Sequence, residues 1–231
     1  MTPTRLTLSL LTLALCACSS PETPSDPTRV GYPPEWWEPV TDDDVPEWEI
    51  LPQAAGRGEV ILSKRNQLGL LSNFAATPFT YRGKRYASLE GFWQCMKYPE
   101  GPGDPRASLP GWEHTREEVA DMVAFDAHAA GVAAEAILDR AGISWVSFEG
   151  EEIEYKGRGI ERHYALIVDA TRCKIAQNPE VEAVLRSTGD LALRADHHED
   201  ADGTKAWAYY TIYMLLRDEL RAGTFHAPPA E

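Results

Sequence analysis

Four side chains with different chemistry recur at helical spacing near the middle of the chain. A helix that begins after Ser88 would place them on one face, at positions i, i+3, i+4 and i+7. They are Glu90, Trp93, Gln94 and Lys97. A carboxylate can act as a general acid or base, an ammonium can bind a phosphate, and an indole offers a flat surface to a base or a sugar. The set therefore fits a pocket for a small, partly charged ligand.

The opposite face of the same helix is apolar. Leu89, Phe92 and Met96 form a stripe that is expected to face the core. The polar face has two interpretations: it lines a site, or it is an ordinary solvated surface from which Trp93 reaches sideways into the core. The spacing alone leaves both open.

The elements expected to position this helix are short strands and further helices. Strands and hairpins are predicted at residues 59–62, 79–86 (turning near Gly83) and 145–155. Helices are predicted at residues 115–125, 127–140, 161–177, 179–188 and 207–222. The proline-rich residues 99–114 are expected to form a long loop flanking a site. The predicted fold class is α+β, a predominantly helical single domain with small β-hairpins, here assigned to residues 59–225.

The charge of the chain is uneven along its length. The formal net charge of the 231 residues is -14. Residues 19–60 hold ten acidic and two basic side chains, which leaves 26 acidic and 19 basic side chains from residue 61 onward. No basic patch is visible, so stable binding to DNA or RNA is not expected. A single nucleotide or modified base remains compatible with this composition.

The first residues have the pattern of an export signal. One arginine precedes an apolar run that is too short for a permanent membrane span, so residues 1–17 are predicted to be a signal peptide. The sequence around Cys18 resembles the bacterial lipobox, which implies lipidation of Cys18 and a lipid anchor in the membrane of the bacterial cell envelope. A plain secretory peptide cleaved nearby is the alternative.

Residues 18–58 have the composition of an acidic, proline-rich linker. Three tryptophans complicate this interpretation, because a pure spacer does not need them. They are Trp36, Trp37 and Trp48. We expect that part of the segment packs on the surface of the domain rather than forming a binding site of its own.

The remaining cysteines and histidines do not suggest a metal site. Cys95 and Cys173 lie in predicted helices and are expected to be buried thiols, although a disulfide between them is open. His197 and His198 are adjacent, so their side chains are expected to diverge.

Several local sequences, taken in order, resemble the NADAR or YbiA-like family. They are Leu71-Ser-Asn-Phe, Ser88-Leu-Glu-Gly-Phe-Trp-Gln-Cys-Met-Lys, Ala127-His-Ala-Ala-Gly, Arg172-Cys-Lys-Ile-Ala-Gln-Asn-Pro, Thr188-Gly-Asp and Met214-Leu-Leu-Arg. The resemblance spans about residues 59–221. It implies an α+β fold and N-glycosidase activity on phosphorylated riboflavin-pathway intermediates or on ADP-ribosylated guanine bases, without a cofactor.

The resemblance also implies roles for individual residues. Glu90 would be catalytic. The substrate-contacting candidates are Asn73, Phe74, Trp93, Gln94, Lys97, Lys174 and His197. Cleavage of a ribosyl C–N bond develops positive charge on the sugar, which a nearby carboxylate stabilises directly or relieves by activating water.

A second carboxylate is common in glycoside chemistry, and two aspartates are candidates. Asp196 is preferred, because capping and turn formation is the more natural role for Asp190. His197 is a candidate for protonating or hydrogen-bonding the leaving group, and a solvated loop histidine is its alternative.

Two departures from the family pattern leave a competing function open. Gly91 stands where the family usually has histidine after the glutamate, and the later family signatures are absent or replaced near Trp207. The expected partner is a nucleotide-like small molecule or an ADP-ribosylated base. The alternative function is a non-catalytic surface lipoprotein that binds an ADP-ribose-like ligand or a protein.

Overall fold

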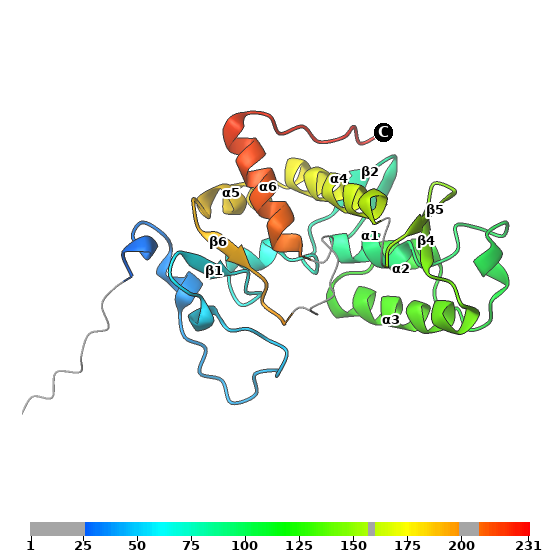
Figure 1. Cartoon of the computed structure of the whole chain (residues 1–231), viewed down its shortest axis with the longest axis horizontal. Coiled ribbons are helices and arrows are strands. Elements are labelled where there is room, and N and C mark those ends of the chain that lie inside the picture. Colours follow the sequence, from blue (N-terminus) through cyan, green and yellow to red (C-terminus); the bar gives the residue numbers. More distant parts are fainter. Residues whose placement is uncertain (1–25, 157–159, 199–207) are drawn as a thin grey trace, which may run out of the picture.

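A computed structural model describes residues 26–156, 160–198 and 208–231 of the chain. These residues form an α+β fold in which helices dominate (Figure 1). The α-helices are α1 (Leu89–Cys95), α2 (Arg116–Ala120), α3 (Ala124–Ala141), α4 (Glu161–Gln177), α5 (Pro179–Ser187) and α6 (Tyr209–Ala222). The predicted signal peptide, Cys18 and Trp207 lie outside the described residues.

The strands of the described residues form three two-stranded sheets. Two of them are the predicted hairpins, β2 (Phe79–Tyr81) with β3 (Lys84–Tyr86) and β4 (Trp145–Phe148) with β5 (Glu151–Glu154). Arg82 and Gly83 both have positive φ, at 50° and 71°, as a tight two-residue hairpin turn requires. These hairpins confirm the strand predictions at both places.

The third sheet was not predicted as a pair. β1 (Glu59–Ile61) pairs in parallel with β6 (Ala192–Arg194), with Val60 opposite Leu193. The pairing continues past the strands, where the Leu62 amide donates to the Arg194 carbonyl at 2.9 Å. The segments that follow β1 and β6 are therefore neighbours, although about 130 residues separate them in the sequence.

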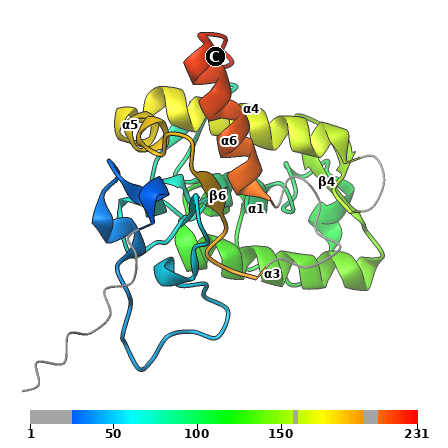
Figure 2. The same cartoon turned by 60° about the vertical axis from the view of Figure 1, so that its left-hand side comes forward.

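Helix α1 lies in the middle of the fold, between α3 and α4 in both views (Figures 1 and 2). Ser88 begins it as predicted, because its Oγ accepts a hydrogen bond from the Gly91 amide at 2.9 Å. The predicted core stripe is confirmed: Leu89, Phe92 and Met96 are 2%, 0% and 0% exposed. The Phe92 ring packs against the Tyr86 ring, with centroids 4.9 Å apart in a T-shaped arrangement.

The proline-rich residues 99–114 form a loop but do not flank the cavity described below. The fully buried Arg106 instead donates to the carbonyls of Met96, Lys97 and Tyr98 at 3.1 to 3.2 Å. These carbonyls directly follow the end of α1, so a guanidinium beside them complements the partial negative charge of the helix end. The loop therefore holds the C-terminal end of α1, and the prediction that it flanks a site is wrong.

Two further boundaries differ from the prediction. The Thr115 and Glu118 capping box is present, but α2 ends at Ala120 and Phe125 belongs to α3. Ala124, at the start of α3, has a positive φ of 51°, and Asp121 ends α2 with a non-helical backbone, so the chain turns between the two helices. The turn places Phe125 on a new helix axis, which matters for the cavity.

The segment before β1 packs against the rest of the described fold. Trp36 is fully buried, Trp37 is 6% exposed, and the Trp37 indole donates to the Glu59 carbonyl at 2.9 Å. These contacts agree with the expectation that part of residues 18–58 packs on the domain. The domain limits themselves stay a prediction.

Candidate active site

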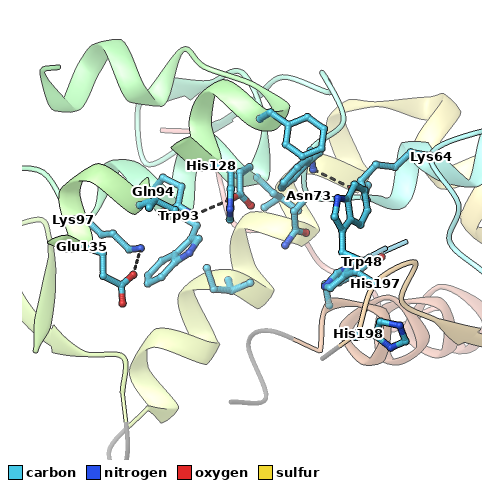
Figure 3. A pocket seen from close by; sticks show the side chains of 18 of the residues that line it. Trp48, Lys64, Asn73, Trp93, Gln94, Lys97, His128, Glu135, His197 and His198 are labelled. Carbon is cyan, nitrogen blue, oxygen red and sulfur yellow. Dashed lines mark hydrogen bonds and ion pairs between the residues drawn. The ribbon is translucent and has the colours of Figure 1, made fainter. Parts of the chain in front are cut away.

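A cavity of about 460 Å³ opens beside α1 and collects residues from distant parts of the chain (Figure 3). Its lining comprises Trp48, Lys64, Ser72, Asn73, Phe74, Leu89, Glu90, Trp93, Gln94, Lys97, Phe125, His128, Val132, Glu135, His163, Ile167, His197, His198 and Tyr209. We call the part formed by α1, α3 and α4 the helix wall. The loop wall is the part formed by Trp48, Lys64, residues 72–74, His197 and His198.

The predicted polar face of α1 lies on the helix wall. Glu90, Trp93, Gln94 and Lys97 all line the cavity, and each is at most 6% exposed. The interpretation of this face as ordinary solvated surface is therefore wrong. The face is buried because α3 and α4 cover it on either side, and the cavity occupies the space that they leave.

The Glu90 carboxylate is held by two neighbours in the cavity. Gln94 donates to Glu90 Oε1 at 2.7 Å, and His128 Nδ1 lies 3.5 Å from the same oxygen. The hydrogen bond with Glu90 raises the pKa of His128, although burial acts in the opposite direction. The Glu90 amide donates to the Asn73 carbonyl at 3.0 Å, which joins α1 to the loop wall.

Gly131 of α3 sets the position of the Gln94 amide. A Cβ at Gly131 would lie 1.8 Å from Gln94 Oε1, so the amide packs directly on the helix backbone at a point where only glycine fits. Gln94 is thereby fixed between α3 and Glu90, and its amide orients the carboxylate.

Lys97 lies at one end of the cavity and is paired with glutamate. Its ammonium is 2.6 Å from Glu135 and lies 5.1 Å from the centroid of the Trp93 ring. Glu135 is also 2.5 Å from the ammonium of Lys156. Burial lowers the pKa of Lys97 and outweighs the opposing ion pair. The Lys97 ammonium, which was predicted to bind a phosphate, is thus paired with the Glu135 carboxylate.

His163 of α4 closes the helix wall behind Trp93. The imidazole is 1% exposed, and its centroid lies 4.5 Å from that of Trp93. Burial lowers the pKa of His163 to about 4, so the ring is neutral at physiological pH. It contributes an uncharged surface to the cavity.

Asn73 and Phe74 line the cavity from the loop wall. The Phe74 ring meets the Phe125 ring edge to face, with centroids 5.2 Å apart. Lys174, in contrast, does not line the cavity. It is fully buried and donates to the Ser72 carbonyl at 2.8 Å, and burial lowers its pKa to about 7. Its position favours support of the Ser72–Phe74 loop over direct contact with a substrate.

Asp196 is close to the site but does not line it. Its side chain is 1% exposed, with Lys64 at 2.5 Å and His197 Nδ1 at 3.1 Å. Burial raises its pKa, but the hydrogen bonds from His197 and Lys64 outweigh that effect and hold the pKa below its ordinary value. Direct attack on a substrate by Asp196 finds no support in this geometry, which instead favours a role in positioning Lys64 and His197. Asp190, the rejected candidate, is 95% exposed beside Arg221.

His197 and His198 both line the cavity. The His197 ring stacks on the Tyr209 ring at 6.0 Å with an interplanar angle of 7°, so the histidine is held on one side by Asp196 and on the other by an aromatic face. In the part of the chain that the structure describes, no three side chains of the metal-binding types gather closely enough to hold an ion. Cys95 and Cys173 are free and buried, as expected of buried thiols.

Three residues of the helix wall were missed although the sequence contains a signal for them. His128, Val132 and Glu135 follow one another at i, i+4 and i+7 on α3, the same spacing that identified the face of α1. Trp48 and Lys64 carry no comparable signal, because β1–β6 pairing and loop contacts bring them to the cavity.

Comparisons with solved structures include a distant likeness. The fold is similar to the NMR structure of the E. coli protein YbiA, with 21% identity over 72% of this chain and 86% of that chain and a TM-score of 0.44. No protein-family model matches the chain, and no curated protein matches it. Among the described residues, no helix combines the length and the apolar character needed to cross a membrane.

Proposed function

We propose that the chain is an N-glycosidase that hydrolyses the bond between a ribosyl carbon and a ring nitrogen of a nucleotide-like compound, such as an ADP-ribosylated base or a ribosyl phosphate. One observation carries the proposal: the Glu90 side chain, 7% exposed, lies on the wall of a cavity of about 460 Å³ with its carboxylate held by Gln94 and His128. The sequence resemblance supports the same reaction class.

The geometry supplies the groups that this hydrolysis needs. The oxygen of a water molecule bonds to the anomeric carbon while the C–N bond breaks. The electron pair of the C–N bond leaves with the ring nitrogen. Glu90 stabilises the positive charge on the sugar and takes a proton from the water. His128, whose pKa is raised by Glu90, donates a proton to the leaving nitrogen. Transfer of the proton from Glu90 to His128 across 3.5 Å restores both groups.

The size and the two ends of the cavity support a nucleotide-sized ligand. The volume lies within the range of about 300 to 1,000 Å³ that is common for small-molecule sites. Figure 3 shows Lys97, Glu135 and Trp93 at one end and Lys64, Trp48 and His197 at the other, with His128 and Asn73 between them. A ligand that spans both ends places its scissile bond beside the middle of the cavity, where Glu90 pairs with His128.

The test is the turnover of a Glu90→Gln variant. Candidate substrates are NAD, GMP, AMP and an oligonucleotide that carries ADP-ribosylated guanine, and released base is measured by liquid chromatography. We expect a loss of roughly 100- to 10,000-fold, as is typical when a general acid or base is removed. Glu135→Gln is the matched control, because Glu135 also lines the cavity but contacts lysines only, and its loss should be smaller.

The outcomes separate the enzyme from its alternative. Unchanged turnover in Glu90→Gln removes Glu90 from the mechanism. Binding of ADP-ribose by calorimetry with no base released from any candidate substrate contradicts the enzyme and identifies a non-catalytic binding protein. Circular dichroism of each variant checks that the fold is retained.

We also propose that the mature chain is tethered to the cell envelope through a lipid on Cys18. The support is the lipobox-like sequence, and the acidic segment that follows would hold the domain away from the membrane. Cys18→Ser should move the protein from the membrane fraction to the soluble fraction of the cell envelope. An unchanged distribution contradicts the tether.

A further inference from the structure

We propose that Trp48, from the segment before the predicted domain, stacks on a planar ring of the substrate and so restricts the substrate to ring-bearing ribosyl compounds. The proposal rests on the proposed function for the reaction at Glu90, but the ring site itself is a binding property. Trp48 lines the cavity and is 42% exposed, which is unusual for a side chain of this size. Its apolar face is available to a ligand.

Trp48 is one member of an aromatic cluster at the mouth of the cavity. The Phe125 ring, 57% exposed, meets the Trp48 ring at 6.1 Å with an interplanar angle of 62°. Phe74 meets Phe125 at 5.2 Å and 83°. Val132, also 57% exposed, adds to the same mouth. This exposed apolar surface is continuous with the lining that contains Glu90, so we assign its occupant to the same ligand.

The segment that carries Trp48 is held in place by contacts directly after that residue and by a contact at Asp42. Glu49 is 6% exposed and forms two parallel hydrogen bonds with the Arg65 guanidinium, at 2.7 and 2.8 Å. Arg65 also contacts Asp42 at 2.9 Å. The Ile50 amide donates to the Asp196 carbonyl at 2.8 Å. Trp48 is therefore held in place before a ligand arrives, which reduces the entropy lost on binding.

Lys64 completes the mouth from the side of the loop wall. Its ammonium lies 5.5 Å from the Trp48 centroid and 5.2 Å from the Phe74 centroid, while Asp196 pairs with it from behind. Figure 3 shows Trp48 beside Lys64, with His197 next to them. These cation–π contacts hold the Lys64 ammonium beside both rings while Trp48 stays 42% exposed. A flat conjugated ring is the ligand group that such faces bind with little dependence on sequence or substituents.

The experiment compares ligands that differ only in the ring. Calorimetry measures the binding of AMP, GMP and ribose 5-phosphate to protein that carries Glu90→Gln, so that no ligand is consumed. Adding Trp48→Leu should weaken the binding of AMP or GMP by roughly 5- to 100-fold, the usual effect of losing a base–aromatic stack, and leave ribose 5-phosphate unchanged. Trp48→Phe should restore most of the affinity. Leu215→Ala is the control, because Leu215 is 43% exposed but does not line the cavity.

Each remaining outcome overturns the inference. If neither AMP nor GMP binds more tightly than ribose 5-phosphate, the cavity has no ring site. If Trp48→Leu weakens all three ligands equally, Trp48 supports the fold of the cavity only. Failure of the proposed function is a separate result: the binding difference between AMP and ribose 5-phosphate can be present in a protein that releases no base.

Discussion

The two walls of the cavity are built in different ways. The helix wall takes four of its residues from α1, Lys97 from just past the end of that helix, and four from α3, and the residues from α1 and Lys97 are at most 6% exposed. The loop wall takes its residues from four separate stretches of chain, and Trp48 and His197 stay about 40% exposed. One lysine of each wall pairs with a carboxylate, but the two pairs differ in which partner is buried.

This difference indicates which contacts stabilise each wall. On the helix wall the lysine is the buried partner, and Glu135 has a second cation in Lys156. On the loop wall the carboxylate of Asp196 is the buried partner, and its charge is compensated by His197 and Lys64. A buried charge that loses its partner is costly, whereas packed helices keep most of their contacts when a charge is removed. The loop wall should therefore depend on its ion pair and the helix wall should not.

The largest expected effect tests this dependence directly. Lys64→Met leaves the Asp196 carboxylate buried with only His197 beside it, and we expect the free energy of unfolding to fall by about 3 to 5 kcal/mol. Lys97→Met keeps a chain of similar size against Trp93 and leaves Glu135 with Lys156. Lys97→Met should lower the free energy of unfolding by less than about 1.5 kcal/mol. Urea unfolding measures both.

The control for this comparison removes the buried charge as well. Lys64→Met combined with Asp196→Asn should regain much of the lost stability, because no uncompensated carboxylate remains. Equal losses for Lys64→Met and Lys97→Met would contradict the contrast between the walls.

The same difference explains how much of the site could be predicted from the sequence. The face of α1 was found because one element with a fixed period sets the relation among Glu90, Trp93 and Lys97. Trp48 and Lys64 reach the cavity only because β1 pairs with β6 and Glu49 pairs with Arg65. Neither pairing leaves a periodic pattern, and three residues are too few to identify a strand such as β6.

The direction of side chains is a second feature that could not be predicted from the sequence. Asp196 was predicted as a second catalytic carboxylate, but whether its side chain faces the cavity or Lys64 depends on contacts across 132 residues. Residues 99–114 were correctly predicted as a loop, yet the Arg106 guanidinium goes to the carbonyls at the end of α1 rather than to a ligand. Local sequence identifies the element in both cases and leaves its long-range partner undetermined.

The second prediction uses pH to separate the walls. The pKa of His163 is about 4 in the folded protein and about 6.5 in the unfolded chain, so the unfolded state binds more protons between these values. Stability that is fully present above pH 6.5 is therefore lost as the pH falls toward 4, by about 2 to 3 kcal/mol. His163→Phe should remove that loss and keep a ring against Trp93.

The loop wall should respond in a different range. The pKa of Asp196 is lowered in the folded state, so its contribution is present above its ordinary pKa of about 3.8 and is lost only as the pH falls further. Urea titrations at pH 7, 5.5 and 4.5 should show most of the difference between the wild type and His163→Phe before Asp196 is protonated. An equal pH dependence of both proteins in that range contradicts a buried neutral imidazole.

The third prediction concerns Gly91, which directly follows Glu90 in α1. A Cβ at Gly91 would lie 2.7 Å from the Met122 carbonyl oxygen and 3.0 Å from that of Val119, both backbone atoms that cannot rotate away. Gly91→Ala should lower the free energy of unfolding by about 1 to 2 kcal/mol, because overpacking outweighs the gain in helix propensity. Gly101→Ala is the control, since nothing lies within 4 Å of its Cβ position. Equal stability of the two variants would show that α1 and α2 separate easily.

The smallest expected effect tests how the loop wall holds Trp48. Glu49→Gln replaces the charged partner of Arg65 by an amide of the same shape. Because an ion pair near the surface contributes little stabilising free energy, we expect the affinity for AMP or GMP to fall by only about two- to fivefold. The affinity for ribose 5-phosphate should not change. Because Glu49 does not line the cavity, a loss confined to the ring-bearing ligands shows that it acts through the position of Trp48. Combining Glu49→Gln with Trp48→Leu should add nothing, and an additive loss would place the effect of Glu49 elsewhere.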